Sequence, residues 1–242
     1  MIQESKLKVI SYKDLKHQLP AGNKLAALYE KAKNPSKFDA LLFPVHEGDI
    51  ETDSLNLLDE IYWGTYYKYV HEQEDLVLSQ PIVLGNVRVK VLSFFEGMVT
   101  GDVLTRNMWT RYPDQNDGLA QVGGNLTVTE VLFMEGKGIK KSTCLAVAGD
   151  AAIHTLINAS TAEIKAGKLS VQKEFLFPFT YTTADKGKHA LKGTDWSNHA
   201  AAELSAYFNP ALLDMEYLHD NVNFFFRVGT HLSREYHAYL VK

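Results

Sequence analysis

Apolar and polar positions alternate along the middle of the chain in a way that predicts β-strands. In the run Val87–Val91 valine stands at every second position, and a second β-like run follows over Met98–Trp109. A period of two is typical of a strand with one buried face. We expect these two runs to pair as an antiparallel hairpin. The same alternation predicts strands over Leu126–Met134, Leu169–Thr183 and Val222–Val228.

Helical signals dominate the N-terminal part of the sequence. Asn23 is a candidate cap for a helix over Lys24–Lys33, which should stop near Pro35 because the residue before a proline disfavours helical backbone. Ser54 is a candidate cap for a second helix, which would gather apolar and aromatic side chains on one face as far as Tyr69. The N-terminal third is therefore predicted to be largely helical.

Two further helices are predicted in the second half of the chain, over Ser142–Ala166 and Ser197–Phe208. In the first of them, polar residues recur at steps of three or four and would form one stripe on the helix surface. This stripe consists of Asp150, His154, Asn158, Thr161 and Lys165.

Strands and helices occupy separate stretches of the sequence instead of alternating. This arrangement favours an α+β fold with a mainly antiparallel sheet and packed helices. No fixed period of 20 to 50 residues repeats and no low-complexity linker divides the chain. We expect one integrated domain over residues 1–242, with a helix-rich region over about 1–78 and an α+β body over about 79–242.

Composition excludes several classes of protein. The 242 residues are 45% hydrophobic and 22% charged, which indicates a folded chain with a sizeable core. The 25 Lys and Arg are outnumbered by 29 Asp and Glu, so no basic surface for nucleic acid is expected. No apolar run approaches a membrane span, and the N-terminal residues resemble no signal peptide. A single cysteine excludes an internal disulfide and agrees with a cytoplasmic protein.

The segment Glu135–Thr143 is a candidate anion-binding loop. It places glycines and lysines before the predicted helix, whose free N–H groups would face an anion. The segment does not match the phosphate-binding P-loop, because Glu135 and Lys140 occupy the positions of the required glycines. A flexible connection between two elements is the simpler interpretation. The candidate ligands are Gly136, Lys137, Gly138, Lys140, Lys141, Ser142 and Thr143.

Candidate catalytic and metal-binding residues are few. Asp150 lies one helical turn before His154 and would orient its imidazole for acid or base catalysis, although a solvated helix face has the same pattern. Cys144 is a candidate nucleophile, although it also fits a small buried residue. His199 and Glu203 share a helix face, and His219 or His237 would supply a third ligand if the fold brings it close. The H-E-x-x-H zinc pattern is absent, so we expect no metal and no cofactor.

Aromatic residues supply the candidate interface. Five of them crowd the short segment Tyr62–Tyr69, and the polar segment Arg111–Gly118 is longer than a hairpin needs. Most aromatics are expected in the core, but tyrosine and tryptophan also suit protein interfaces. The candidate interface residues are Tyr62, Trp63, Tyr66, Tyr67, Tyr69, Arg111 and Tyr112.

Two functions remain in view. The first is a structural or interaction subunit of a larger assembly, such as a virion or a secretion apparatus, formed as a homo-oligomer or with other protein subunits. The alternative is an enzyme or binding protein for a small anionic or phosphorylated ligand held by the basic glycine loop 136–143. Either protein would reside in the cytoplasm or in a particle assembled there.

Overall fold

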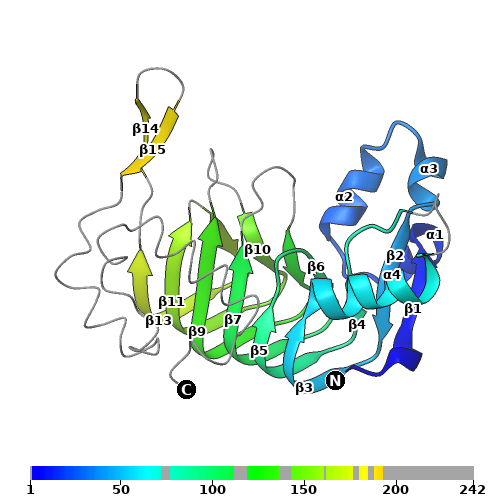
Figure 1. Ribbon diagram of the computed structural model, residues 1–242, viewed down its shortest axis with the longest axis horizontal. Coiled ribbons are helices and arrows are strands. Elements are labelled where there is room, and N and C mark those ends of the chain that lie inside the picture. Colours follow the sequence, from blue (N-terminus) through cyan, green and yellow to red (C-terminus); the bar gives the residue numbers. More distant parts are fainter. Residues whose placement is uncertain are drawn as a thin grey trace.

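Two sheets of stacked strands form the body of the protein in a computed structural model (Figure 1). The structure describes residues 2–71, 77–111, 119–136, 143–160, 162–176, 180–184 and 188–192. Sheet A contains β1 (Leu7–Ser11), β2 (Leu42–Glu47), β4 (Ile82–Leu84), β6 (Gly97–Val99), β8 (Ala120–Val122), β10 (Thr143–Val147) and β12 (Glu163–Lys165), in that order. Sheet B contains β13 (Leu169–Leu176), β11 (Ala151–Ser160), β9 (Leu126–Gly136), β7 (Val103–Arg111), β5 (Val87–Ser93) and β3 (Ile50–Asn56).

The chain alternates between the two sheets from β2 to β13. Each strand of sheet A is followed in the chain by a strand of sheet B, and the two strands together make one coil. Both strands pair in parallel with the corresponding strands of the next coil, as β2 does with β4 and β3 with β5. The result is a β-solenoid of stacked coils. The prediction of a mainly antiparallel sheet is therefore wrong. Alternating hydrophobicity shows which side of a strand is buried, but it carries no information about the direction of the neighbouring strand.

The predicted hairpin over Val87–Trp109 is wrong for the same reason. The run Met98–Trp109 bends at Gly101, so that its first part joins sheet A as β6 and its second part joins sheet B as β7. β7 then lies parallel to β5, with Val103 opposite Val87. Antiparallel pairing within the described residues is limited to β1 with β2 and to a separate pair, β14 (Thr180–Ala184) with β15 (Lys188–Lys192).

A glycine stands at each sharp corner where the chain passes from sheet A to sheet B. The backbone N–H of Gly101 donates to the carbonyl of Gly85 at 2.9 Å, and that of Gly124 donates to the carbonyl of Gly101 at 3.0 Å. A Cβ atom on Gly101 would lie only 2.8 Å from the Gly85 carbonyl oxygen. The corners can stack this closely because glycine has no side chain. The stacked corners are Gly48-Asp49, Gly85-Asn86, Gly101-Asp102, Gly124-Asn125, Gly149-Asp150 and Gly167-Lys168.

The residues after the first five corner glycines form a second ladder, in which each position carries Asp or Asn. The side-chain Oδ1 of one residue accepts the backbone N–H of the equivalent residue one coil further on, and acids alternate with amides along the row. The N–H of Asn86 also lowers the pKa of the Asp49 carboxyl group. The four bonds run from Asn86 to Asp49 (2.7 Å), Asp102 to Asn86 (2.8 Å), Asn125 to Asp102 (2.7 Å) and Asp150 to Asn125 (3.0 Å).

We expect Asn125→Asp to destabilise the fold at neutral pH. The substitution keeps the acceptor but places a carboxylate about 4.8 Å from the carboxylates of Asp102 and Asp150, which costs about 1–2 kcal/mol in a water-like dielectric. Urea unfolding at several pH values measures this cost. The cost is present where carboxylates are charged and is lost as pH falls below about 4. Asn125→Ser is the control without added charge, and a cost independent of pH would contradict the explanation.

The corner pairs constitute a repeat that a search for one fixed period misses. Gly85 and Gly101 are much closer in sequence than Gly48 and Gly85. The intervals differ because the connections from sheet B back to sheet A vary in length, and the longest described one carries two helical segments between β3 and β4. Connections outside the stack can vary without disturbing the paired strands.

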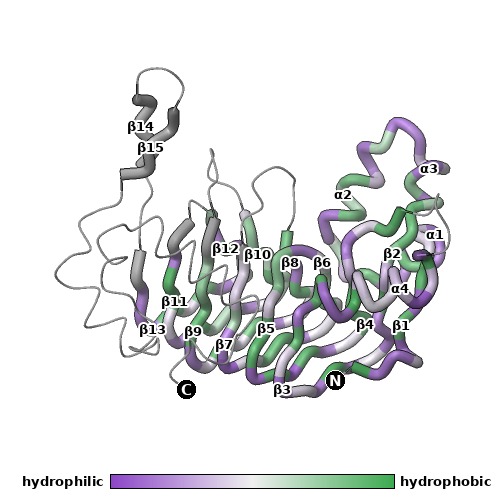
Figure 2. Tube along the Cα trace, in the orientation of Figure 1, coloured by the Kyte–Doolittle hydropathy of each residue, from purple (hydrophilic) through white to green (hydrophobic). Residues whose placement is uncertain are grey.

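The main core lies between the two sheets and consists of buried apolar side chains from both. Figure 2 shows hydrophobic residues recurring along the strands of both sheets. Leu92, Met108 and Leu132 stack on sheet B, and Val99 and Val122 face them from sheet A. The first coil is closed by η3 (Leu57–Trp63), a π-helical segment, and by α4 (Gly64–Tyr69). The η3 side chains buried in this core are Leu57 and Ile61.

Short N-terminal helices cover part of the outer face of sheet A. Leu15 and Leu25 pack there against Phe43 and Met98 in a second cluster. Asn23 caps its helix as predicted, since its Oδ1 accepts the Ala26 N–H at 2.9 Å. The prediction of a helical N-terminal third is wrong, because the same region contains β1, β2 and β3. The helices are η1 (Glu4–Lys6), α1 (Tyr12–Leu15), η2 (Lys16–Gln18), α2 (Lys24–Glu30) and α3 (Pro35–Asp39).

The predicted helix over Ser142–Ala166 is also wrong. Within the described residues this segment forms the strands β10, β11 and β12, with a corner at Gly149. β11 is paired on both edges, with β9 and with β13, so its backbone groups are satisfied by neighbouring coils. Tertiary pairing overrides the local preference of the small residues for a helix. The predicted helix over Ser197–Phe208 and the strand over Val222–Val228 lie outside the described residues.

Candidate functional site

Asp150 and His154 do not form a catalytic pair. Asp150 stands in the corner ladder, and His154 lies on the exposed face of β11 with its Nδ1 2.9 Å from Thr155 Oγ1. Four residues of extended strand separate them by about 13 Å, whereas the predicted helix would have placed them one turn apart. Asn158 and Lys165 lie on β11 and β12, so the predicted polar stripe is not formed.

Cys144 is buried in the core between the sheets. Burial raises the pKa of its thiol to about 12, so the thiol is protonated at neutral pH. The thiolate is the nucleophilic form of cysteine. This environment therefore does not activate Cys144.

The basic glycine loop is described only at its two ends. Gly136 is the last residue of β9 and Thr143 is the first residue of β10. Thr143 thus begins a strand, so the helix that was expected to direct N–H groups at an anion is absent from this position. The remaining candidate ligands lie outside the described residues: Lys137, Gly138, Lys140, Lys141 and Ser142.

The metal candidates His199 and Glu203 also lie outside the described residues, as does Tyr112. Where the chain is described, no three His, Cys, Asp or Glu side chains gather in a way that would hold a metal ion. Over the same residues, no helix has the length and apolar character needed to cross a bilayer.

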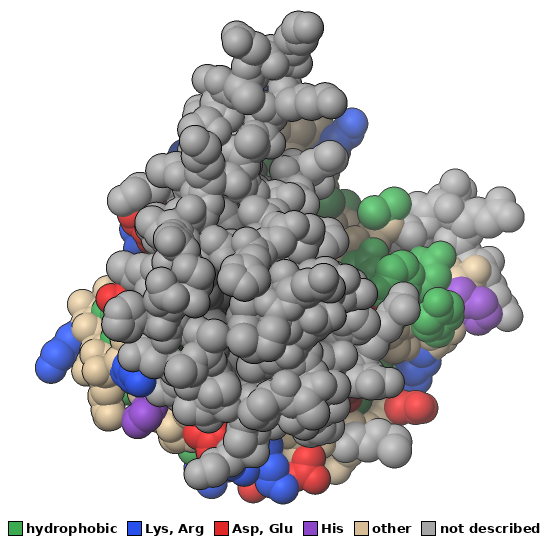
Figure 3. Space-filling model, turned by 60° about the vertical axis from the view of Figure 1, so that its left-hand side comes forward, with side chains coloured by type: hydrophobic (Ala, Val, Ile, Leu, Met, Phe, Trp, Pro, Cys, Tyr) green, Lys and Arg blue, Asp and Glu red, His purple; other side chains and the backbone are tan. Residues whose placement is uncertain are grey.

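Four aromatic side chains on η3 and α4, Tyr62, Trp63, Tyr66 and Tyr67, form an aromatic patch. Trp63 is central, with ring centroids 5.1 Å from Tyr62, 5.4 Å from Tyr66 and 6.0 Å from Tyr67. Trp63 is 40% exposed and Tyr67 is 64% exposed. In Figure 3, hydrophobic side chains gather at the right-hand side of the visible face. The patch therefore presents ordered rings that are packed on one another and only partly covered by the protein.

Two neighbours of the aromatic patch have different surroundings. The Tyr69 hydroxyl donates to the Leu7 carbonyl at 2.8 Å, which ties α4 to β1 and gives this tyrosine a structural contact. The Glu96 carboxylate lies close enough to Tyr62 to contribute to the raised pKa of that phenol, whose main cause is burial. Burial also raises the pKa of Glu96. A partly buried carboxylate therefore borders the patch.

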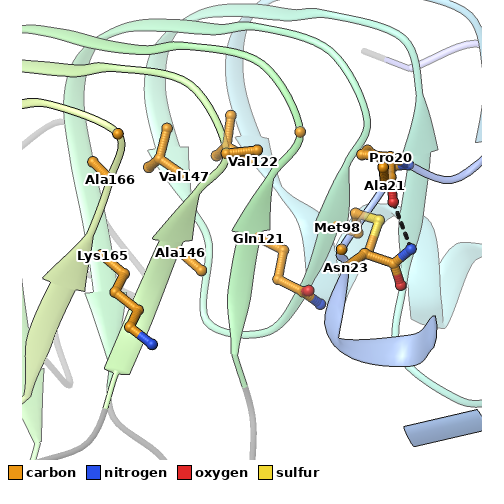
Figure 4. A pocket seen from close by; sticks show the side chains of 14 residues that line it. Pro20, Ala21, Asn23, Met98, Gln121, Val122, Ala146, Val147, Lys165 and Ala166 are labelled. Carbon is orange, nitrogen blue, oxygen red and sulfur yellow. Dashed lines mark hydrogen bonds between the residues drawn. The ribbon is translucent and has the colours of Figure 1, made fainter. Parts of the chain in front are cut away.

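A groove of about 420 Å³ lies on the outer face of sheet A, beside the N-terminal helices (Figure 4). Its floor is one row of residues at matching positions on four successive strands: Met98, Gln121, Ala146 and Lys165. The loop Pro20–Asn23 forms one wall. In the row the small side chain of Ala146 separates the polar side chains of Gln121 and Lys165.

The wall of the groove is fixed by local contacts. Asn23 donates from Nδ2 to the Pro20 carbonyl at 2.7 Å, and its Oδ1 caps α2. Gly22 adopts a φ of +70°, which favours glycine. Pro20 rests on Gly123, where an added Cβ would clash with the proline ring. These contacts hold the loop against the corner of the solenoid.

Sequence reasoning did not identify the groove. Gln121 carries no motif, and Lys165 was assigned to a helix surface. Its residues come from five separate segments, and only the stacking of coils brings them together. The corner pairs were the detectable signal, because they fix which residues of successive coils share a row.

Comparisons of the chain with protein-family models, with curated proteins and with solved structures gave no match.

Proposed function

We propose that this protein is an interaction subunit of a larger protein assembly, in which the solenoid is the rigid support and the aromatic patch is the docking surface. The observation that carries the proposal is the partial exposure of Trp63 and Tyr67 within a cluster of aromatic rings in contact with one another. Tryptophan and tyrosine are enriched among the residues that dominate interface energies. Rings already packed on one another also lose little side-chain entropy on docking.

The carboxylate beside the patch indicates the chemistry of the partner. Glu96 is partly buried next to Tyr62, and burial disfavours its charged form. An arginine or lysine of the partner would compensate this carboxylate while its side chain packs on the rings. We therefore assign the patch to a different protein surface that carries a basic side chain.

We expect Trp63→Ala combined with Tyr67→Ala to weaken binding of the partner tenfold or more, as truncation of interface aromatics costs about 2 kcal/mol. The test isolates the tagged protein with its native partner from source cells and compares the recovered partner for each variant. Both rings are partly exposed, so thermal unfolding should change little. Glu96→Gln should weaken binding less, and mainly at low salt.

The matched control is Leu28→Ala, which removes a 43% exposed apolar side chain from α2, outside the patch. Recovery of the partner should be unchanged for this variant. The proposal fails if the protein recovers no partner. It also fails if the variant with both Trp63→Ala and Tyr67→Ala recovers as much partner as the wild type does. Light scattering tests a different outcome, in which the wild type self-associates and the patch substitutions abolish this self-association. In that case the partner would be a second copy of the chain.

A further inference from the structure

We infer that the groove on sheet A binds a small organic anion with an apolar body, whose oxygen acceptor contacts Gln121 and whose charged group contacts Lys165. Nothing in this inference depends on the aromatic patch, because the groove is lined by other elements. The support comes from the orientation of one amide, an unused donor and the position of one cation.

The orientation of the Gln121 amide is determined by its neighbour. The backbone N–H of Lys24 donates to Gln121 Oε1 at 2.9 Å. Because an N–H group needs an acceptor, the oxygen of the amide must occupy this position and the nitrogen must occupy the other. The donor Nε2 is therefore directed away from Lys24 N, at the end of the groove that the Pro20–Asn23 loop closes.

Gln121 Nε2 has no hydrogen-bond partner among the described residues, although Gln121 is only 7% exposed. A buried donor without an acceptor costs about 1–3 kcal/mol. An oxygen atom of a ligand that reaches this end of the groove would remove the cost. A ligand without an acceptor at this position would leave the cost in place, so the amide selects for a carbonyl or hydroxyl oxygen.

Lys165 places a positive charge at the other end of the row. It stands two strands from Gln121, so the backbones of the two residues are about 9.6 Å apart at the usual spacing of 4.8 Å between strands. Its side chain is exposed and forms no ion pair with a described residue. One cation favours a singly charged group such as a carboxylate.

The surface between the two polar groups limits the body of the ligand. Ala146 lies in the row between the two polar side chains and offers apolar contact without filling the space. A volume of about 420 Å³ is at the small end of the range for ligand sites. The groove therefore fits a compact monocarboxylate with an apolar body and an oxygen acceptor several bonds from its charge.

N-acetyl-L-phenylalanine has these features and serves as the probe, with its uncharged primary amide as the matched ligand. We expect saturable binding of the acid with a Kd on the order of a millimolar, and binding of the amide about two- to fivefold weaker. Titration monitored by protein NMR measures both. Lys165→Ala should weaken binding of the acid by the same factor and leave binding of the amide unchanged. The control is Lys168→Ala, which removes an exposed lysine outside the groove and should change the affinity for neither ligand.

Gln121→Glu tests the amide at pH 8 with little change in shape. Glutamate keeps an oxygen for the Lys24 N–H, removes the donor and adds a negative charge, so the acid should bind at least about tenfold more weakly. If this variant unfolds, the Lys165→Ala comparison decides alone. The inference is overturned if the acid shows no saturation up to about 10 mM. It is also overturned if the acid binds the wild type, Lys165→Ala and folded Gln121→Glu equally.

Discussion

Gly101→Ala is expected to destabilise the protein by about 3 kcal/mol or more, because it adds a methyl group inside the stack of corners. The new Cβ would lie 2.8 Å from the carbonyl oxygen of Gly85 and 2.9 Å from its carbonyl carbon. These are backbone atoms of the neighbouring coil and cannot rotate away. Relief requires the coils to separate, which would weaken the hydrogen bond from Gly101 N–H to Gly85.

Gly167→Ala is the matched control at the last described corner. There the nearest atoms to a new Cβ, Asp150 Oδ1 and the Gly149 carbonyl oxygen, are both 3.1 Å away, so a small shift accommodates the methyl group. We expect a cost below about 1 kcal/mol. Chemical denaturation of the two variants measures the difference. Equal costs would show that the corners tolerate side chains and that stacking at this distance does not require glycine.

Asn107→Ala is expected to lower the free energy of unfolding by about 2–4 kcal/mol. Asn107 is a buried side chain whose hydrogen bonds stabilise a register shift between β7 and β9. Asn107 is 3% exposed. Its Oδ1 accepts the Val131 N–H at 3.2 Å, and its Nδ2 donates to the Glu130 carboxylate at 3.1 Å. The register of β9 shifts at this point, since Val128 pairs opposite Thr105 but Val131 pairs opposite Asn107. Alanine would leave the buried Val131 N–H without this acceptor.

Thermal and urea unfolding measure the loss, and Thr129→Ala is the control on the same bulge. Thr129 is exposed and its hydroxyl makes only a long 3.5 Å contact with the Thr105 carbonyl. Its substitution should cost less than about 0.5 kcal/mol. A small effect of Asn107→Ala would contradict the view that this side chain fixes the bulge. Asn107→Asp separates its two roles, since it keeps the acceptor for Val131 and places a second carboxylate beside Glu130.

Local signals in the sequence were interpreted correctly where neighbouring residues alone decide the conformation. Val87–Val91 is a strand because its alternation matches one buried and one exposed face, and Asn23 caps α2 because its side chain reaches an N–H three residues later. The predicted Ser54 cap is wrong, because Ser54 lies in β3; the helical segment η3 begins after Asn56, whose Oδ1 accepts the N–H groups of Leu58 and Asp59. These interactions span a few residues, so the sequence alone contains them.

By itself, then, the sequence determined the strand periods, the helix cap at Asn23, the aromatic cluster and the lack of a disulfide. Only the tertiary structure decided which strands pair, because parallel coils bring together residues far apart in sequence, such as Val87 and Val103 or Gln121 and Lys24. Asp150 and His154 show the consequence. The same two residues are one turn apart on a helix and about 13 Å apart on a strand, and pairing with other coils selects the strand. The groove was likewise beyond prediction, because its row of side chains exists only after the coils have stacked.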